Sequence, residues 1–220
     1  MENASSDGVP PVPTRLTLTD LAVRRSLADR EEASADEVRR LLDAGLEVMR
    51  RCGTTTTPKV AEIVREAGSS NQAFYRYFAT KHDLVAAIVE AGRQRLAGYL
   101  QHQMEKGKGP EAKVRRWVDG VLAQAGDREV AHATRSVLWN ADQLGDRLRG
   151  KLTPDHEILA AQLREPLSQL GSPDPDRDAA LMCHAVMGRM QELLWRHSQP
   201  TNADAVQIMR FCLSAVRRPA

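Results

Sequence analysis

The stretch AGSSNQAFYRYFATKHDL, residues 67–84, decides the fold. It contains four of the chain's nine aromatic side chains (three Trp, three Tyr and three Phe), all within five consecutive residues. At helical spacing Phe74 and Phe78 lie on one face, whereas Asn71 and Tyr75 lie on another. The stretch therefore predicts a short helix with an apolar face and a hydrogen-bonding face, which follows a tight glycine turn. Such a helix has the shape to enter the major groove of DNA.

Two further helices are predicted before this stretch. The first covers residues 35–51, with Ser34 as its N-cap, and shows the apolar spacing of an amphipathic helix. The second is expected to start with Thr57 as N-cap and Pro58 at the first helical position, and to stop at Gly68. Three helices of this size, joined by tight turns, indicate a helix-turn-helix unit.

Helices are also predicted throughout the rest of the chain. Thr80 and Asp83 form a capping-box pair that opens a fourth helix. Glycine or proline residues then separate five amphipathic segments, at about 109–124, 129–139, 154–170, 175–197 and 203–216. No stretch alternates apolar and polar residues for long enough to form a sheet, so the fold class is predicted to be all-α.

The N-terminal residues differ in composition from the rest. Residues 1–17 are rich in Pro, Ser and Thr, which is typical of a disordered arm. Residues 20–32 have the pattern of a short helix that carries Arg24 and Arg25. Two interpretations stay open for this region: a mobile extension, or an arm that reaches phosphates or the minor groove of DNA.

Composition and charge indicate an ordinary soluble protein. The 220 residues are 42% hydrophobic and 27% charged, with a net charge of +2. No apolar run approaches the ~18 residues of a membrane span, and residues 1–15 lack a secretory apolar segment, so a cytoplasmic protein without a membrane partner is expected. Residues 54–81, however, contain four basic and two acidic residues. This modest excess of positive charge suits a site-specific DNA binder.

Enzyme motifs are not found. Cys183 and His184 are neighbours on a predicted helix and point about 100° apart, so they do not form a nucleophile and base. The sequence has no glycine-rich phosphate loop, HExxH motif or nucleophile elbow. The three cysteines are widely spaced, which favours buried thiols over a zinc site or a disulfide framework. We expect no catalytic residues, metal or cofactor.

The segment from Val38 to Val85 resembles the TetR family of transcriptional repressors. The resemblance rests on LLDAGL at residues 41–46, AG at 67–68, FYRYF at 74–78 and TKHDL at 80–84, in the family's order and spacing. It implies a three-helix DNA-binding domain at residues 34–82, with the helix-turn-helix at about 58–78, after the flexible N-terminal arm predicted at residues 1–33. It also implies a C-terminal helical ligand-binding and dimerisation domain at residues 83–220.

The groove-facing residues depart from the family's usual pattern. Ser69 replaces an apolar turn residue, while Asn71, Gln72 and Ala73 replace a basic residue, a glycine and a hydroxyl residue. The scaffold is kept while the reading residues differ, which favours an unusual operator. Loss of DNA binding is the alternative: the chain would then be a helical small-molecule or partner-binding protein with a degenerate DNA-binding head.

The third helix is the predicted reading element. Ser70 caps it and places its N-terminus at the duplex. Asn71 and Gln72 are the candidate base readers because their amides pair with adenine, and Arg76 is expected to read guanine or hold a phosphate. By resemblance, backbone phosphates are held by Thr55, Thr57, Lys59, Tyr75, Tyr77 and Lys81. The alternatives are tyrosines half-buried in the core and a solvated Lys81.

A dimer is expected because one such helix reads only a few base pairs, and two-fold copies read half-sites ~34–36 Å or more apart in a palindrome. The last two helices carry apolar stripes that suit an intersubunit four-helix bundle. Their members in the predicted homodimer interface are Met182, Val186, Met190, Leu193, Val206, Met209, Leu213 and Val216. The alternative is that these stripes pack only within one chain.

A ligand cavity is expected among the middle helices, because all three tryptophans lie outside the DNA-binding domain. A small, largely apolar effector would relieve repression by favouring a dimer geometry that no longer matches the operator. The candidate ligand-binding residues are Met104, Trp117, Val121, Leu122, His132, Arg135, Trp139 and His156. The alternative is that these are ordinary core and surface residues.

Overall fold

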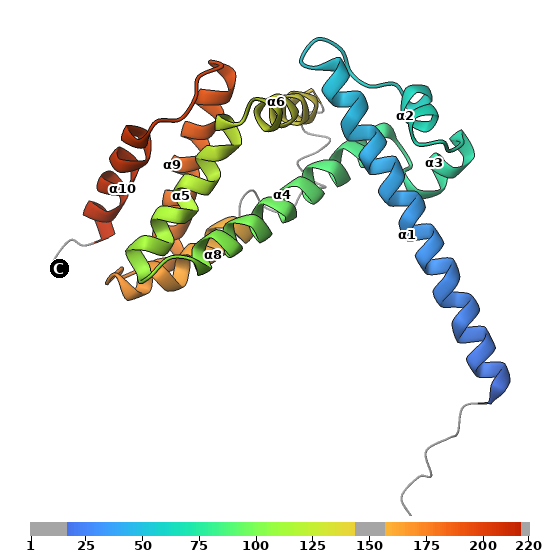
Figure 1. Ribbon diagram of the computed structural model, residues 1–220, viewed down its shortest axis with the longest axis horizontal. Helices are drawn as coiled ribbons and strands as arrows, with labels where there is room; N and C mark the ends of the chain where they lie inside the picture. Colours follow the sequence, from blue (N-terminus) through green and yellow to red (C-terminus); the bar gives the residue numbers. More distant parts are fainter. Residues whose placement is uncertain (1–16, 144–156, 217–220) are drawn as a thin grey trace, which may run out of the picture. The chain divides into compact units, whose positions relative to one another are not determined.

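The computed structural model describes residues 17–143 and 157–216, and every regular element in these two ranges is a helix (Figure 1). The chain forms two compact units, residues 1–39 and residues 40–220. The helices are α1 (Leu18–Cys52), α2 (Val60–Glu66), α3 (Asn71–Tyr77), α4 (Lys81–Glu105), α5 (Pro110–Gly126), α6 (Arg128–Asp142), α8 (Glu157–Gln169), α9 (Pro175–Trp195) and α10 (Asn202–Val216). Within the described ranges, none is both long and apolar enough to cross a membrane. The all-α prediction is confirmed.

Helix α1 corrects the prediction for the N-terminal region. A single helix runs from Leu18 to Cys52, so Ser34 lies inside it and is not an N-cap. The reason is local: residues 18–44 contain no Gly or Pro and are rich in Ala, Leu, Glu and Arg, all good helix formers. Residues 18–33 are therefore helical rather than part of a flexible arm, whereas residues 1–16 lie outside the described part.

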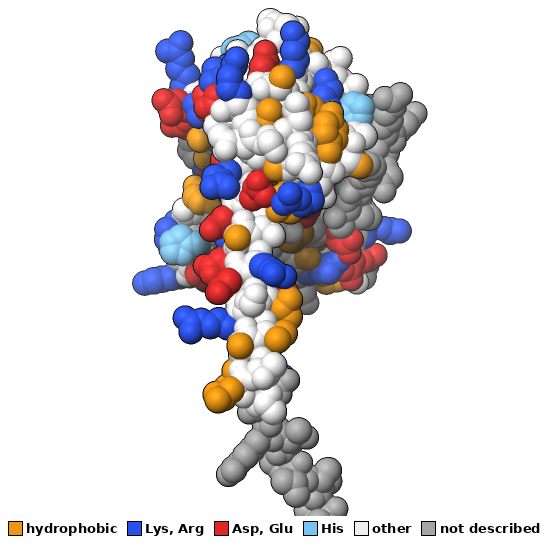
Figure 2. Space-filling view, turned by 90° about the vertical axis from the view of Figure 1, so that its right-hand side faces the viewer, with side chains coloured by type: hydrophobic (Ala, Val, Ile, Leu, Met, Phe, Trp, Pro, Cys, Tyr) orange, Lys and Arg blue, Asp and Glu red, His pale blue; other side chains and the backbone are white. Residues whose placement is uncertain are grey.

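The residues of α1 in the first unit carry charges of both signs. Residues 18–39 contain four arginines and six acidic residues, a net negative charge that does not favour contact with DNA phosphates. Four large apolar side chains in this segment are exposed: Leu18, Leu21, Val23 and Leu27. On the face drawn in Figure 2, Lys and Arg side chains are likewise scattered among Asp and Glu side chains.

The second unit begins with a small domain made by the C-terminal part of α1, by α2 and α3, and by the start of α4. Its core includes Leu41, Met49, Ile63, Phe74 and Leu84, whose side chains are completely buried. Gly45 brings α1 close to α4, since a Cβ atom there would lie 2.8 Å from side-chain atoms of Leu84 and Ile88.

The remaining helices of this unit form a larger domain, which the sequence analysis predicts to be regulatory and which is called the regulatory domain below. Helix α4 packs on α5, α5 on α9, α8 on α9, and α10 against both α5 and α9 (Figure 1). Their inward faces share one apolar core. The predicted helix boundaries lie within a few residues of the observed ones, except that the predicted start at residue 154 lies outside the described residues.

The predicted dimer stripes mostly face this core. Met182, Val186, Met190 and Leu193 of α9 are buried within the single chain. The same is true of Met209, Leu213 and Val216 of α10, whereas Val206 is exposed. These seven residues pack inside the protomer, as the alternative interpretation expects, and a role for them in a dimer interface stays a prediction.

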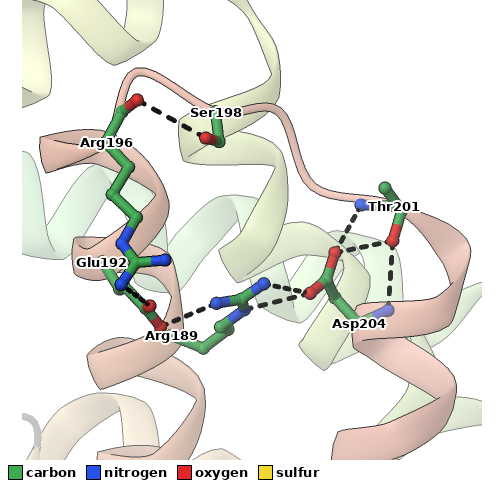
Figure 3. A network of polar contacts seen from close by, with 6 residues as sticks. All are labelled: Arg189, Glu192, Arg196, Ser198, Thr201 and Asp204. Carbon is green, nitrogen blue, oxygen red and sulfur yellow. Dashed lines mark hydrogen bonds and ion pairs between the residues drawn. The ribbon is translucent and has the colours of Figure 1, made fainter.

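A polar network fixes α10 against α9 (Figure 3). Arg189 of α9 donates to Asp204 Oδ1 from Nε and Nη2, at 3.0 and 2.6 Å, and to Glu192 from Nη1 at 2.6 Å. Asp204 also accepts from the backbone N–H and the hydroxyl of Thr201, both at 2.7 Å. The hydrogen bonds from Thr201, and then that from Arg189, lower the pKa of Asp204 to about 2.

Candidate DNA-binding surface

The turn between α2 and α3 is built from short-range hydrogen bonds. Gly68 has φ of +59°, a left-handed conformation that glycine adopts readily. The Ser69 N–H donates to the Val64 carbonyl at 2.9 Å, and the Gly68 N–H to the Arg65 carbonyl at 3.3 Å. This is the hydrogen-bond pattern of a Schellman motif, which ends α2 sharply and allows α3 to start at Asn71.

Helix α3 is capped by Ser70 as predicted, because its Oγ accepts from the Ala73 N–H at 3.1 Å. Ala73 and Phe74 are buried, and the Phe74 and Phe78 rings lie 5.6 Å apart between centroids. This confirms the predicted apolar face of α3. The core contact therefore fixes the rotation of the helix about its axis.

The opposite face of α3 is open to solvent. Asn71, Gln72, Tyr75 and Arg76 are all exposed, and Tyr75 keeps 57% of its surface. Tyr75 nevertheless packs edge-on against Phe74, at 5.2 Å between ring centroids. This contact holds the Tyr75 ring, while its hydroxyl group points toward solvent. Tyr77 is only partly exposed, and the Arg76 guanidinium lies 5.8 Å from its ring centroid. The geometry offers amide, phenol and guanidinium groups on one surface.

The start of α2 differs from the prediction. Lys59, not Thr57, is the N-cap of α2, and the Glu62 carboxylate accepts from the Lys59 backbone N–H at 3.4 Å. Thr57 instead accepts a hydrogen bond from Lys81 Nζ at 3.1 Å, and the Pro58 carbonyl lies 3.5 Å from the same ammonium. Lys81 thus ties the first turn of α4 to the segment that leads into α2. Thr57 and Lys59 remain exposed beside it.

The start of α4 is fixed by its own cap. The Asp83 carboxylate accepts from the Thr80 N–H at 2.8 Å, and Thr80 Oγ1 accepts from the Asp83 N–H at 3.3 Å. This confirms the predicted capping box, which sets the position of Lys81 one residue after the cap.

Thr55 borders an open polar hollow of about 470 Å³ between the end of α1 and α2. The hollow is lined by Val48, Arg51, Cys52, Thr55, Thr56, Glu62, Arg65 and Glu66. The Thr55 hydroxyl donates to the Cys52 carbonyl at 2.8 Å, which closes the turn after α1. Across the hollow, Arg51 pairs with Glu66 at 2.7 Å, and this hydrogen bond raises the pKa of Arg51.

The predicted ligand residues are not all in one place. Met104, Trp117, Val121 and Leu122 are buried in the regulatory core. Trp117 Nε1 donates to Gln162 Oε1 at 3.1 Å. Arg135 donates to the Leu194 carbonyl at 3.3 Å, Trp139 is half-buried, and His156 lies outside the described residues.

His132 lies apart from the buried members of the predicted ligand set. Its side chain is exposed, and Nε2 lies 2.8 Å from the Arg50 carbonyl in the last turn of α1. It therefore links α6 to the small domain. Sequence reasoning also missed Ser136 and Asn140, which are 1% exposed on α6. Their spacing from His132, at i+4 and i+8, is the signal that places all three on one helix face.

Comparison with known proteins gives a family match for the small domain alone and structural matches for most of the chain. Residues 41–88 match the family model described as "Bacterial regulatory proteins, tetR family". This range covers the C-terminal part of α1, helices α2 and α3, and the first part of α4. No curated protein sequence matches the chain.

Solved structures share the fold over most of the chain. A TetR-family transcriptional regulator from Mesorhizobium loti has a TM-score of 0.61 and 19% identity, over 83% of this chain and 96% of that chain. A TetR-type transcriptional regulator from Streptomyces avermitilis has a TM-score of 0.57 and 21% identity, over 83% and 99%. The regulator FadR from Bacillus subtilis, solved in complex with stearoyl-CoA, has a TM-score of 0.55 and 20% identity, over 81% and 96%. At these identities the likeness shows the fold.

Proposed function

We propose that this chain, whose residues 41–88 form a TetR-family DNA-binding domain, is a transcriptional regulator that binds a palindromic operator as a homodimer and is released by a small, largely apolar effector. The observation that carries the proposal is the exposed polar face of α3, held by the buried Phe74 and capped by Ser70. A helix fixed at its cap and at its back can present the same side chains to every operator copy.

The exposed residues of α3 divide into two roles. Asn71 and Gln72, in its first turn, carry amides that pair bidentately with adenine in the major groove. Arg76 has the geometry for guanine or phosphate. Tyr75 and Tyr77, together with the Lys81 ammonium beside Thr57, suit phosphate contacts that fix register.

The homodimer would form through the outer faces of α9 and α10. Leu181, Trp195, Val206 and Phe211 lie on these helices and are 63%, 46%, 47% and 73% exposed. Large apolar side chains exposed on two neighbouring helices make these helices the candidate subunit interface. The Arg189–Asp204 contact supports this role because it fixes the angle between the two helices.

The effector would bind within the regulatory domain. An effector that lowers operator affinity about 100-fold needs only ~2.7 kcal/mol of preference for the released state. Stearoyl-CoA, the ligand in the FadR structure, is a reasonable first probe of the apolar class. Its acyl chain is apolar, as is the core around Trp117 and Val121.

Binding selection from random double-stranded DNA at physiological salt tests the proposal, with the mass of the protein in solution measured on the same sample. A palindromic motif recovered by a dimer is the expected result. A folded protein that enriches no motif, or whose DNA binding is weak and insensitive to salt, would contradict it, because phosphate contacts make specific binding strongly salt-dependent.

A further inference from the structure

Two polar side chains lie inside the regulatory domain on one face of α6. Among the described residues, Ser136 and Asn140 are the buried polar side chains, each 1% exposed. Helix α6 packs against α4 and α5, whose inward faces are apolar. Buried polar groups in such surroundings are normally hydrogen-bonded, and an exception calls for an explanation.

Asn140 is such an exception. Its Nδ2 donates to the Ser136 carbonyl at 2.8 Å, whereas its Oδ1 is buried without a hydrogen-bond partner among the described residues. Rotating the amide by 180° does not remove the problem, because Oδ1 would then face the Ser136 carbonyl, and two acceptors cannot bond. The carbonyl therefore fixes Oδ1 as the open group.

The open acceptor belongs to a column of side chains along α6. The Ser136 hydroxyl donates to the His132 carbonyl at 2.9 Å, one turn earlier. The side chain of that same residue, His132, reaches the Arg50 carbonyl in the DNA-binding domain, with Nε2 2.8 Å from the oxygen. The face of α6 that holds Asn140 is thus also the face that touches α1.

We propose that Asn140 Oδ1 is the polar recognition point of the effector, which is an apolar molecule carrying a hydroxyl or N–H donor. This rests on the proposed function, and it narrows the effector class from apolar molecules to those with a donor. A buried carbonyl oxygen selects strongly for a donor, because an analogue without one leaves the oxygen unsatisfied.

Two pairs of isomers serve as probes: n-octanol with heptyl methyl ether, and benzyl alcohol with anisole. Each pair has the same atoms, but only the alcohol donates. Operator DNA is first shown to bind, which tests the proposed function separately. We then expect at least one alcohol to raise the Tm and release operator at a concentration about 10-fold lower than its ether, as one hydrogen bond allows.

Asn140→Leu is the decisive variant, with Ser136→Ala as its control. Asn140→Leu should keep operator binding, keep or raise the Tm without a probe, and lose the preference for alcohol over ether. Ser136→Ala removes a satisfied hydrogen bond, so it should lower the Tm and keep the preference. Asn140→Met offers a more adaptable side chain if the branched leucine does not fit.

Equal responses of the wild-type protein to alcohol and ether would overturn the inference, as would a preference that survives in Asn140→Leu and Asn140→Met. A lower Tm in both variants would also overturn it, because it would show that Asn140 is a satisfied structural residue.

Discussion

The DNA-binding domain and the regulatory domain place polar side chains in opposite positions. In α3 the amides, the phenol of Tyr75 and the guanidinium of Arg76 are on the outside, over a completely buried Phe74. In α6 two polar side chains, Ser136 and Asn140, lie on the inside. An outward polar face suits a large, charged partner that arrives from solvent, whereas an inward one suits a small molecule that is enclosed.

The comparison also shows what each domain tolerates. The small domain is held by few core side chains, so its stability depends strongly on each. The regulatory domain has a larger core and contains the unsatisfied acceptor of Asn140, while the small domain contains an unsatisfied donor, Arg50 Nε. Mutations in the two domains should therefore have effects on stability and binding that differ in kind as well as in size.

The largest effect is expected for Phe74→Ala. This side chain is completely buried and contacts Phe78, so its loss should cost about 3–5 kcal/mol and abolish operator binding. Circular dichroism during chemical denaturation measures the loss of stability. Tyr75→Ala is the control on the exposed face and should keep the fold within about 0.5 kcal/mol. Equal destabilisation by the two changes would show that α3 is rotated from the position described.

Sequence reasoning succeeded where structure is decided locally. The Ser70 cap, the Thr80–Asp83 capping box and the Phe74–Phe78 face each depend on residues within four positions of one another. Two local predictions failed: Ser34 lies inside α1 instead of capping it, and the Lys59–Glu62 pair caps α2 instead of Thr57. Thr57 and Lys59 both precede the apolar residues of α2, so the local sequence does not decide which of them is the cap. The structure decides it, because the Thr57 hydroxyl accepts a hydrogen bond from Lys81, a residue distant in the sequence.

The regulatory domain was less predictable, since its residues take their roles from helices far apart in the chain. The stripe of Met182, Val186 and Met190 has the same spacing whether it faces its own core or a partner subunit. In the same way, His132 contacts a carbonyl 82 residues away in the sequence, a contact that no local pattern announces. The spacing of Asn140 from His132 and Ser136 places it on one helix face with them, but only the structure shows that this face is buried at Asn140.

Asp204→Ala is expected to have the next largest effect. The change removes the carboxylate that accepts hydrogen bonds from Arg189 and from the Thr201 N–H. It should lower the free energy of unfolding by about 1.5–3 kcal/mol. Thermal unfolding measures the change. Asp119→Ala is the matched control, because Asp119 pairs with Arg115 on the surface and is half-exposed, so about 0.5 kcal/mol is expected.

The Asp204 contribution also depends on pH. Because the pKa of Asp204 is lowered from 3.8 to about 2, the folded state favours its carboxylate, and the stabilisation is complete above pH 3.8. It is lost as the pH falls through about 2, where the carboxylate of the folded chain is protonated. The Tm difference between wild type and Asp204→Ala should therefore shrink between these pH values. A difference that stays constant would contradict the assignment of the stabilisation to the carboxylate.

Gln72→Ala and Tyr75→Ala separate reading from holding on the outer face of α3. Gln72→Ala should cost about 1–3 kcal/mol at one base position, whereas Tyr75→Ala should weaken binding to every operator variant alike. Affinities for a set of single-base operator variants measure both. If Gln72→Ala leaves the sequence preference unchanged, Gln72 does not face the bases.

The smallest effect is expected where the two domains meet. His132→Leu removes the hydrogen bond to the Arg50 carbonyl, worth about 0.5–1.5 kcal/mol, so amides in the last turn of α1 should exchange with solvent about 2–10-fold faster. Hydrogen exchange measured by mass spectrometry or NMR reports this change. His102→Leu is the control, because His102 is an exposed histidine on α4 that lies 3.8 Å from Glu105 within the same helix. If both variants change exchange at the end of α1 equally, the contact does not couple the domains; if only His132→Leu does, the polar face of α6 acts on the DNA-binding domain through this bond.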